Sequence, residues 1–360
     1  MSERKNVENH SEMRKIQYSG KSSFTLALPK KWVTNQKLKA GDQLSVTIDG
    51  TNNLILSSER KKTYVKKQTN IILDETSERG HIERKIIATY ISGYNQIHIR
   101  SKQKRLTPQQ RSIIKKLVRD KLVGSEIIED SNLIISIQVI LDPSELNIEN
   151  TLKRMSVITQ GMHGDIIYAI KKHDIEMCKE IIRTDDDVDR MGLYVIRQLR
   201  FSLENDSSLE LTNSVNKIYC LGYRMIAKSL ERIADHASLM GQQLMSLNKP
   251  LPKSVLVKLD EFSEFSRGNL EKSMRALVNK DYKLADEVVT TCLEAPKKEL
   301  KILNSDFKMT KDQDVFVVSI LEHIRRVSDY SADISEVVLN LTIDENLKKQ
   351  YNYSSDLESS

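Results

Sequence analysis

Two pairs of acidic residues stand out near the middle of the chain. Glu231 and Asp235 lie in SLERIADHASLM (Ser229–Met240), and Asp185 and Asp189 lie in TDDDVDR. In a helix, residues four apart share a face, where like charges on an exposed surface repel by about 0.2–0.5 kcal/mol. Carboxylate oxygens are also the ligands that hard cations prefer. Two such pairs on adjacent helices would together offer oxygen ligands to a cation.

The apolar pattern around the first pair favours a different interpretation. With Ile233 as the origin and 100° per residue, Glu231 and Asp235 fall at about 160° and about 200°, on the outer face of the helix. Lys228 and Arg232 are near enough to offset their repulsion. A solvated face with ion pairs and a cation site therefore both remain open. The apolar seam that defines the inner face is Ile226, Leu230, Ile233, Ala237, Met240 and Leu244.

The helical half of the sequence contains an internal duplication. AIKKHDIEMCKEII (169–182) aligns with ALVNKDYKLADEVV (276–289) at an offset of 107, so that Asp174 coincides with Asp281. The seam helix aligns with 320–339 at an offset of 94. A repeat of this kind predicts two similar three-helix bundles. The seam positions of the second copy are Ile320, Ile324, Val327, Ser331, Ile334 and Val338.

The second copy lacks part of the acidic pattern. Asp329 stands at the position of Asp235, and Asp333 adds a carboxylate one turn later. Arg325 stands at the position of Glu231, and Pro296 stands at the position of Asp189. We therefore expect an incomplete site in this copy, with Arg325 paired to Asp329 at a spacing of four residues.

Charge is distributed unevenly along the 360 residues. The net charge is +6, but the first 67 residues carry 14 Lys and Arg against 6 Asp and Glu, an excess of eight, so the remainder is at about −2. A basic segment beside a nearly neutral body indicates an anionic partner such as nucleic acid. The alternative is a basic segment that only aids solubility. Low aromatic content, 5%, with 29% charged residues is typical of helical bundles with charged outer faces.

Several classes of protein are disfavoured by what the sequence lacks. No run approaches the roughly 20 apolar residues of a membrane span, and the first residues have no apolar core of a secretory signal. Cys178, Cys220 and Cys292 form no CxxC and are expected to be reduced thiols in a cytoplasmic protein. There is no HExxH, Gly-x-Ser-x-Gly or glycine-rich phosphate loop, so we expect no enzyme activity. Because no long apolar run is present, we also expect no membrane insertion.

The elements expected along the chain change in type twice. RKIQYSG and SFTLAL read as strands, Pro29 opens a helical turn, and QLSVTID with NLILS forms a hairpin. The next segment alternates helices and strands, with an N-cap at Thr107 and a stop at Gly124. Only amphipathic helices follow. The predicted multidomain order is a small β domain over 13–57, a small α+β domain over 62–145, all-α three-helix bundles over 147–247 and 252–343, and a disordered tail over 344–360.

The acidic segments resemble those of PhoU-domain proteins. LERIADHASLM (230–240) is similar to the signature on the last helix of each three-helix PhoU repeat, and EIIRTDDDVDRM (180–191) is similar to the other acidic segment of the family. The resemblance covers roughly residues 150–343. It implies a cytoplasmic regulator of phosphate uptake or signalling that acts with the phosphate transporter, and a site for divalent or trivalent metal, without distinguishing iron, zinc, magnesium and manganese. The metal-ligand candidates are Glu231, Asp235, Asp185, Asp189, Asp329 and Asp333.

The basic segment has a resemblance of its own. Residues 14–46 are similar to the AbrB-like swapped-hairpin module, with matching landmarks at Gly20, Pro29, Gly41 and Asp42. The whole order resembles archaeal phosphate-uptake regulators. This implies a homodimer, made by exchanged hairpins, whose basic residues contact the DNA backbone, so affinity would fall steeply with salt. The DNA-contact candidates are Arg14, Lys15, Lys21, Lys30 and Lys31.

The expected function is therefore a DNA-binding transcriptional regulator of phosphate uptake with a metal-binding or partner-docking helical region. The alternative is a protein–protein regulator, in which the bundles dock on the ATPase subunit of a phosphate transporter and the hairpins only dimerise the chain. Trp32 and Phe24 are expected in the core of the small β domain, because it has few other large apolar side chains.

Overall fold

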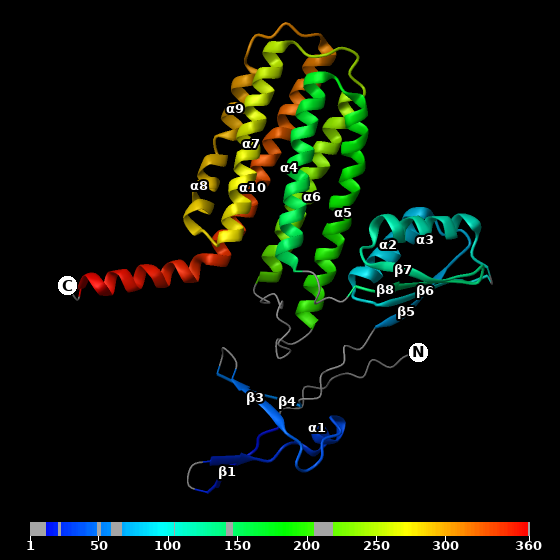
Figure 1. Cartoon of the computed structure of the whole chain (residues 1–360), viewed down its shortest axis with the longest axis vertical. Coiled ribbons are helices and arrows are strands. Elements are labelled where there is room, and N and C mark those ends of the chain that lie inside the picture. Colours follow the sequence, from blue (N-terminus) through cyan, green and yellow to red (C-terminus); the bar gives the residue numbers. More distant parts are fainter. Residues whose placement is uncertain are drawn as a thin grey trace. The chain divides into compact units, whose positions relative to one another are not determined.

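The chain forms two compact units, Met1–Val65 and Lys66–Ser360. Figure 1 shows the elements of each unit, coloured along the sequence. The computed structural model describes residues 12–20, 23–48, 52–58, 67–103, 105–141, 147–204 and 219–358.

In its described residues, the N-terminal unit has two separate hairpins and one short helix. β1 (Ile16–Ser19) pairs antiparallel with β2 (Ser23–Leu26), and β3 (Leu44–Ile48) pairs antiparallel with β4 (Leu54–Ser58). Between them lies α1 (Lys30–Asn35), which begins directly after a proline, as the sequence predicted. The predicted strands and the helical turn are confirmed, whereas an exchange of hairpins between two chains stays a prediction.

The first hairpin presents an exposed apolar face. Ile16, Tyr18, Phe24 and Leu26 are paired across the two strands and are 49–67% exposed, with the rings of Tyr18 and Phe24 4.8 Å apart. The expectation that Phe24 lies in a core is wrong for the single chain, and Trp32 is half-buried. The physical reason is that a two-stranded hairpin buries a face only when another layer packs on it.

An α+β domain opens the second unit. Its sheet has the order β5-β6-β8-β7, with β5 parallel to β6 and the other pairs antiparallel. Alternate residues such as Ile97, Ile99, Ile135 and Ile137 are fully buried in its own core. The elements are β5 (Gln68–Leu73), α2 (Arg79–Ile91), β6 (Gln96–Ser101), α3 (Pro108–Lys121), β7 (Ser125–Asp130) and β8 (Ile134–Val139).

The predicted start of α3 is confirmed in detail. The Thr107 hydroxyl accepts a hydrogen bond from the Gln110 amide, and the Gln110 side chain accepts one from the Thr107 amide, which makes a capping box. Proline at the first helical position needs no hydrogen-bond partner for an amide. After the helix, Gly124 adopts φ +66°, a conformation that favours glycine. These caps set where α3 ends, and so where its last residue, Lys121, lies.

The remaining helices make the two predicted copies. α4, α5 and α6 form the first, and α7, the broken pair α8 and α9, and α10 form the second (Figure 1). One hydrophobic core runs through both copies. The bounds are α4 (Ile148–Lys172), α5 (Ile175–Glu204), α6 (Cys220–Leu244), α7 (Lys253–Asn279), α8 (Tyr282–Cys292), α9 (Ala295–Leu303) and α10 (Lys311–Glu358).

The duplication is confirmed by the turn that follows the first helix of each copy. His173 and Lys280, 107 residues apart, both cap their helices in the left-handed conformation, at φ 54° and 50°. The next residues, Asp174 and Asp281, each accept a hydrogen bond from the amide three positions later. All twelve seam residues of α6 and α10 are buried. The offsets read from the sequence therefore correspond to equal local geometry.

Two features of the second copy depart from the first. Pro296 lies in the first turn of α9, and the helix is interrupted just before it, because proline cannot donate the hydrogen bond that would continue α8. At the other end, α10 continues to Glu358, so the disordered tail predicted over 344–360 is wrong for 344–358. That stretch has no glycine or proline to stop a helix.

Across the described part of the chain, none of the helices combines the length and the apolar character that crossing a membrane requires.

Candidate functional site

The structure brings the two predicted acidic pairs together. Asp185 and Asp189 on α5 face Glu231 and Asp235 on α6, and we call these four residues the acid cluster. Burial, followed by the charges of Asp235 and Asp189, raises the pKa of Asp185 to about 7. Burial, followed by the charges of Asp189 and Glu231, raises the pKa of Asp235 as well. The carboxylates therefore repel one another across the helix pair.

Close packing of α5 against α6 explains why the pair on α6 is half-buried. A Cβ atom on Gly192 of α5 would lie 3.5 Å from Glu231 Oε2, and one on Gly241 of α6 would lie 3.5 Å from Cys178. Glu231 and Asp235 are therefore half-buried against α5 rather than on a fully solvated outer face, while the ion pair of Glu231 with Lys228 is present. The apolar seam predicts a single packing face on this helix, whereas in the structure α6 contacts α4, α5 and α10.

One oxygen of the cluster has no partner. Asp185 Oδ1 is buried and accepts no hydrogen bond. Leaving a buried polar atom unsatisfied costs about 1–3 kcal/mol, which a bound cation would recover. The donors are carboxylates, which suit a hard cation. Among the described residues, however, no group of three or more His, Cys, Asp or Glu already surrounds one ion position. The residues fit a cation in chemical type, and their side chains would have to turn to bind one.

Two lysines partly neutralise the acid cluster. Lys121, at the end of α3, donates hydrogen bonds to Asp186 and Asp189, at 2.6 and 2.9 Å. Burial lowers the pKa of Lys121, but the bonds to these two carboxylates outweigh burial and raise it. Lys228 pairs with Glu231, as its position on the helix predicted. Sequence reasoning missed Lys121, because it lies in another domain and no spacing relates it to α5.

In the second copy, an arginine stands at the position that Glu231 occupies in the first copy. Arg325 donates to Asp329 at 2.5 Å, which confirms the predicted pair, and to Glu299 on α9 at 2.8 Å. Arg325 and Glu299 are only 20% and 17% exposed. Glu299 was missed, because no motif contains it. Burial, then the charges of Glu336 and Asp329, raises the pKa of Asp333.

His236, beside the acid cluster in sequence, faces a different neighbour. Its Nδ1 lies 2.7 Å from Nδ1 of His323, and its Nε2 lies 3.4 Å from the Tyr330 hydroxyl, both on α10. Burial, then the charge of His323, lowers the pKa of His236 to about 4. This histidine pair links the two copies, and its contacts hold the His236 ring against α10.

Four of the five predicted DNA contacts lie on the surface of the N-terminal unit. Lys15, Lys30 and Lys31 are exposed, and Arg14 is exposed and pairs with Glu12. Lys21 lies outside the described residues. The exposed lysines flank the first hairpin and the start of α1, which leaves their ammonium groups available to an anion.

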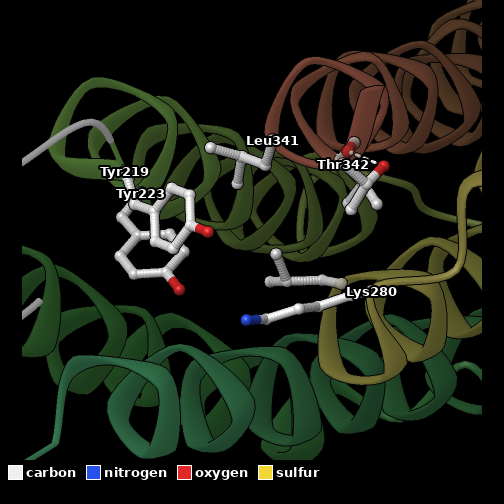
Figure 2. A pocket seen from close by; sticks show the side chains of 7 residues that line it. Tyr219, Tyr223, Lys280, Leu341 and Thr342 are labelled. Carbon is white, nitrogen blue, oxygen red and sulfur yellow. Dashed lines mark hydrogen bonds between the residues drawn. The ribbon is translucent and has the colours of Figure 1, made fainter. Parts of the chain in front are cut away.

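A small cavity lies at one end of the helical region, between α6, α7 and α10. Figure 2 shows the side chains of Tyr219 and Tyr223 across from Lys280, with Leu341 and Thr342 beside them. Its volume of about 10 Å³ is at the lower limit for one water molecule. The cavity is therefore too small for an organic ligand, and the acid cluster remains the candidate site.

Comparison with known proteins identifies the helical half. Residues 152–244 and 259–338 match the model of the PhoU domain, so each copy carries PhoU sequence. PhoU from Pseudomonas aeruginosa is similar in structure, with 16% identity, a TM-score of 0.48, and coverage of 55% of this chain and 96% of that one. The phosphate transport system regulatory protein PhoU from Streptococcus pneumoniae has 17% identity, a TM-score of 0.46, and coverage of 54% and 92%. No curated protein matches the sequence.

Proposed function

We propose that this protein is a cytoplasmic regulator of phosphate uptake or phosphate signalling rather than an enzyme. In this proposal, the N-terminal unit forms a homodimer that binds DNA, and the acid cluster binds a divalent or trivalent cation. The observation that carries it is the double match to the PhoU domain over the helices that build the acid cluster. Regulation of phosphate transport is the role that this family resemblance implies.

Cation binding is supported by the acid cluster itself. Burial and the charges of the neighbouring carboxylates raise the pKa of Asp185 and of Asp235, and the buried Oδ1 of Asp185 has no partner. The second copy supports at most a weaker site, because Arg325 already neutralises Asp329, leaving Asp333 as the remaining candidate ligand. Iron, zinc, magnesium and manganese all remain candidates, since carboxylate donors alone do not select among them.

Dimerisation is supported by the exposed apolar faces of both hairpins. Ile16 and Phe24 on the first hairpin, and Ile48 and Leu54 on the second, are each more than 60% exposed. Two-stranded hairpins are at best marginally stable in water, and burial against another layer stabilises them. A second copy of the same unit would supply that layer, as the AbrB-like resemblance implies.

DNA binding is supported by the excess of eight positive charges in the first 67 residues. The test is fluorescence anisotropy of the full-length protein with DNA from its own upstream region, at about 50 and about 200 mM salt. We expect affinity to fall steeply with salt. Replacing both Lys30 and Lys31 with alanine should weaken binding and reduce the salt slope by up to about 0.9 per lost phosphate contact.

A matched control is the double replacement of Lys37 and Lys39 with alanine. These lysines are equally exposed and belong to the same unit, but they follow α1 rather than begin it. Equal losses in the two double variants would show that net charge, and not a defined surface, drives binding. No binding at low salt would rule out the DNA part of the proposal.

One observation favours the alternative, regulation by protein contact alone. The PhoU match, over residues 152–244 and 259–338, lies in the helical region. In this reading the bundles dock on the ATPase subunit of a phosphate transporter, and the hairpins only dimerise the chain. Co-purification with that ATPase, together with no retention on DNA, would select this alternative.

A further inference from the structure

One face of α5 serves as a docking surface for the α+β domain. Asp186, Asp189, Leu193, Arg197 and Glu204 are separated by three, four, four and seven residues, which places them within about 80° on the helix. Each of them contacts the α+β domain or the residue that precedes its first strand, by ion pair, hydrogen bond or apolar packing. The domain is therefore held along several turns of α5.

The position of Lys121 on this surface is held by its neighbours. The hydroxyl of Tyr90, at the end of α2, donates to the Val123 carbonyl at 3.0 Å. Arg197 of α5 donates to the carbonyl of Tyr90, and its guanidinium lies 4.8 Å from the centre of the Tyr90 ring. Leu122 is 1% exposed. Val123, two residues after Lys121, is thus linked through Tyr90 to Arg197 of α5, which helps to hold the Lys121 ammonium beside the acids.

Asp189 belongs to both the docking surface and the acid cluster. It accepts a hydrogen bond from Lys121, and its charge raises the pKa values of Asp185 and Asp235. A single ammonium reaches only Asp186 and Asp189, so Asp185 Oδ1 is left without a partner. Lys121 therefore neutralises only part of the charge that a divalent cation would neutralise.

We propose that Lys121 is a tethered counter-ion of the acid cluster, and that a divalent cation from solution competes with it for Asp189. This inference rests on the cation site proposed above. A cation bound to Asp189 releases Lys121 and loosens the end of α3 from α5. Because coupling is reciprocal, docking of the α+β domain lowers the affinity of the cluster for the cation by the same factor. The α+β domain would then respond to occupancy of the cluster.

Competition is tested by titrating Mn²⁺ into chelator-treated, full-length protein in a calorimeter. Lys121→Met keeps the apolar length of the side chain and removes the charge, and we expect it to bind Mn²⁺ about five- to tenfold more tightly than the unmodified protein. Lys115→Met is the matched control, because Lys115 also lies on α3 but pairs with Asp130 within its own domain. Its affinity should equal that of the unmodified protein.

Hydrogen exchange of the same samples gives a readout independent of affinity. In the unmodified protein, Mn²⁺ should increase amide exchange at the end of α3 and in the following residues, through Ser125. In Lys121→Met, exchange there should already be high and insensitive to Mn²⁺. The unmodified protein alone tests this step if Lys121→Met fails to fold.

The outcomes separate the inference from the function on which it rests. Equal or weaker Mn²⁺ binding by Lys121→Met, or bound Mn²⁺ that leaves exchange at α3 unchanged in the unmodified protein, would overturn the competition and leave the cation site standing. Absence of Mn²⁺ binding in all three proteins would overturn both.

Discussion

The two helical copies share a scaffold and differ in how they balance charge. Both turn after their first helix through a left-handed cap followed by an aspartate, and both bury the same seam. In the first copy, four carboxylates meet across α5 and α6, and a lysine from another domain donates a hydrogen bond to one of them, Asp189. In the second copy, Arg325 lies between Glu299 and Asp329 within the same bundle.

This difference shows that apolar packing and charge placement can change independently in a repeat. The seam positions remained apolar or small, since a change there would leave a cavity or overpack a shared core. In the second copy, Arg325 supplies a positive charge from within the bundle. Pro296 interrupts the helical segment that corresponds to α5, the helix that carries Asp185 and Asp189 in the first copy. The first copy takes part of its compensating charge from Lys121 of another domain, and the second copy takes it from Arg325 of the same bundle.

The largest expected effect comes from removing one acid of the first copy. Asp235→Asn should weaken Mn²⁺ binding by at least about tenfold, because it removes one carboxylate donor from the cluster, and changes even to the partners of metal ligands cost 10–100-fold. Asp329→Asn is the matched change in the second copy and should leave Mn²⁺ binding unaltered. Calorimetric titration of both variants makes the comparison, and equal losses would break it.

A second effect should appear in stability and only in the second copy. Arg325→Met should lower the free energy of unfolding by about 2 kcal/mol, because Glu299 and Asp329 would lose the cation that compensates their burial. Lys228→Met removes the partner of Glu231, but that lysine is 49% exposed, so we expect a loss below about 1 kcal/mol. Urea unfolding of both variants measures the difference. A loss from Lys228→Met as large as that from Arg325→Met would contradict this account.

The pH dependence of stability should report the repulsion within the acid cluster of the first copy. The folded-state pKa of Asp185, about 7, is above its ordinary value of 3.8, so the folded protein holds a proton that the unfolded chain has lost between these values. The contribution of Asp185 is therefore present at low pH and is lost as pH rises toward 7.

Asp185→Asn removes this titration and tests its sign. In metal-free protein, the variant should be more stable than the unmodified chain by about 1–2 kcal/mol at pH 8, with little difference at pH 4. Urea unfolding at several pH values in chelator makes the measurement. A larger gain at pH 4 than at pH 8 would reverse the sign and contradict the repulsion within the acid cluster.

The smallest effects should be equal in the two copies. His173→Gly and Lys280→Gly should each raise the free energy of unfolding by about 0.5–1 kcal/mol, because glycine adopts the left-handed cap without the steric cost of a Cβ atom. Thermal unfolding of the two variants tests whether the caps are equivalent. A gain in one copy and a loss in the other would show that the shared backbone geometry hides different strain.

The sequence predicted the scaffold well because periodicity and caps are local. The N-cap at Thr107, the repeat offsets and the pair of Arg325 with Asp329 all follow from neighbours within a few residues or from one alignment. The depth of Glu231 and Asp235 could not be predicted in this way. It depends on Gly192 and Gly241, which bring α5 close to a second side of α6.

Contacts made over long stretches of chain were the hardest to predict. Lys121 reaches Asp189 across 68 residues, and Glu299 reaches Arg325 from a helix that begins only because Pro296 interrupts the preceding one. Neither Lys121 nor Glu299 belongs to a sequence motif, and only the fold brings each of them to its partner. Similarly, Phe24 is exposed because, among the described residues, no second layer packs on its hairpin.

The central claim is that the first copy, and not the second, takes a cation from solution. It is tested most directly by crystals of the full-length protein grown with Mn²⁺, with anomalous scattering used to locate the metal. The account predicts an anomalous peak between α5 and α6, among Asp185, Asp189, Glu231 and Asp235, and none beside Arg325. A peak at Asp329 and Asp333 with none at the acid cluster, or no peak at either, would contradict it.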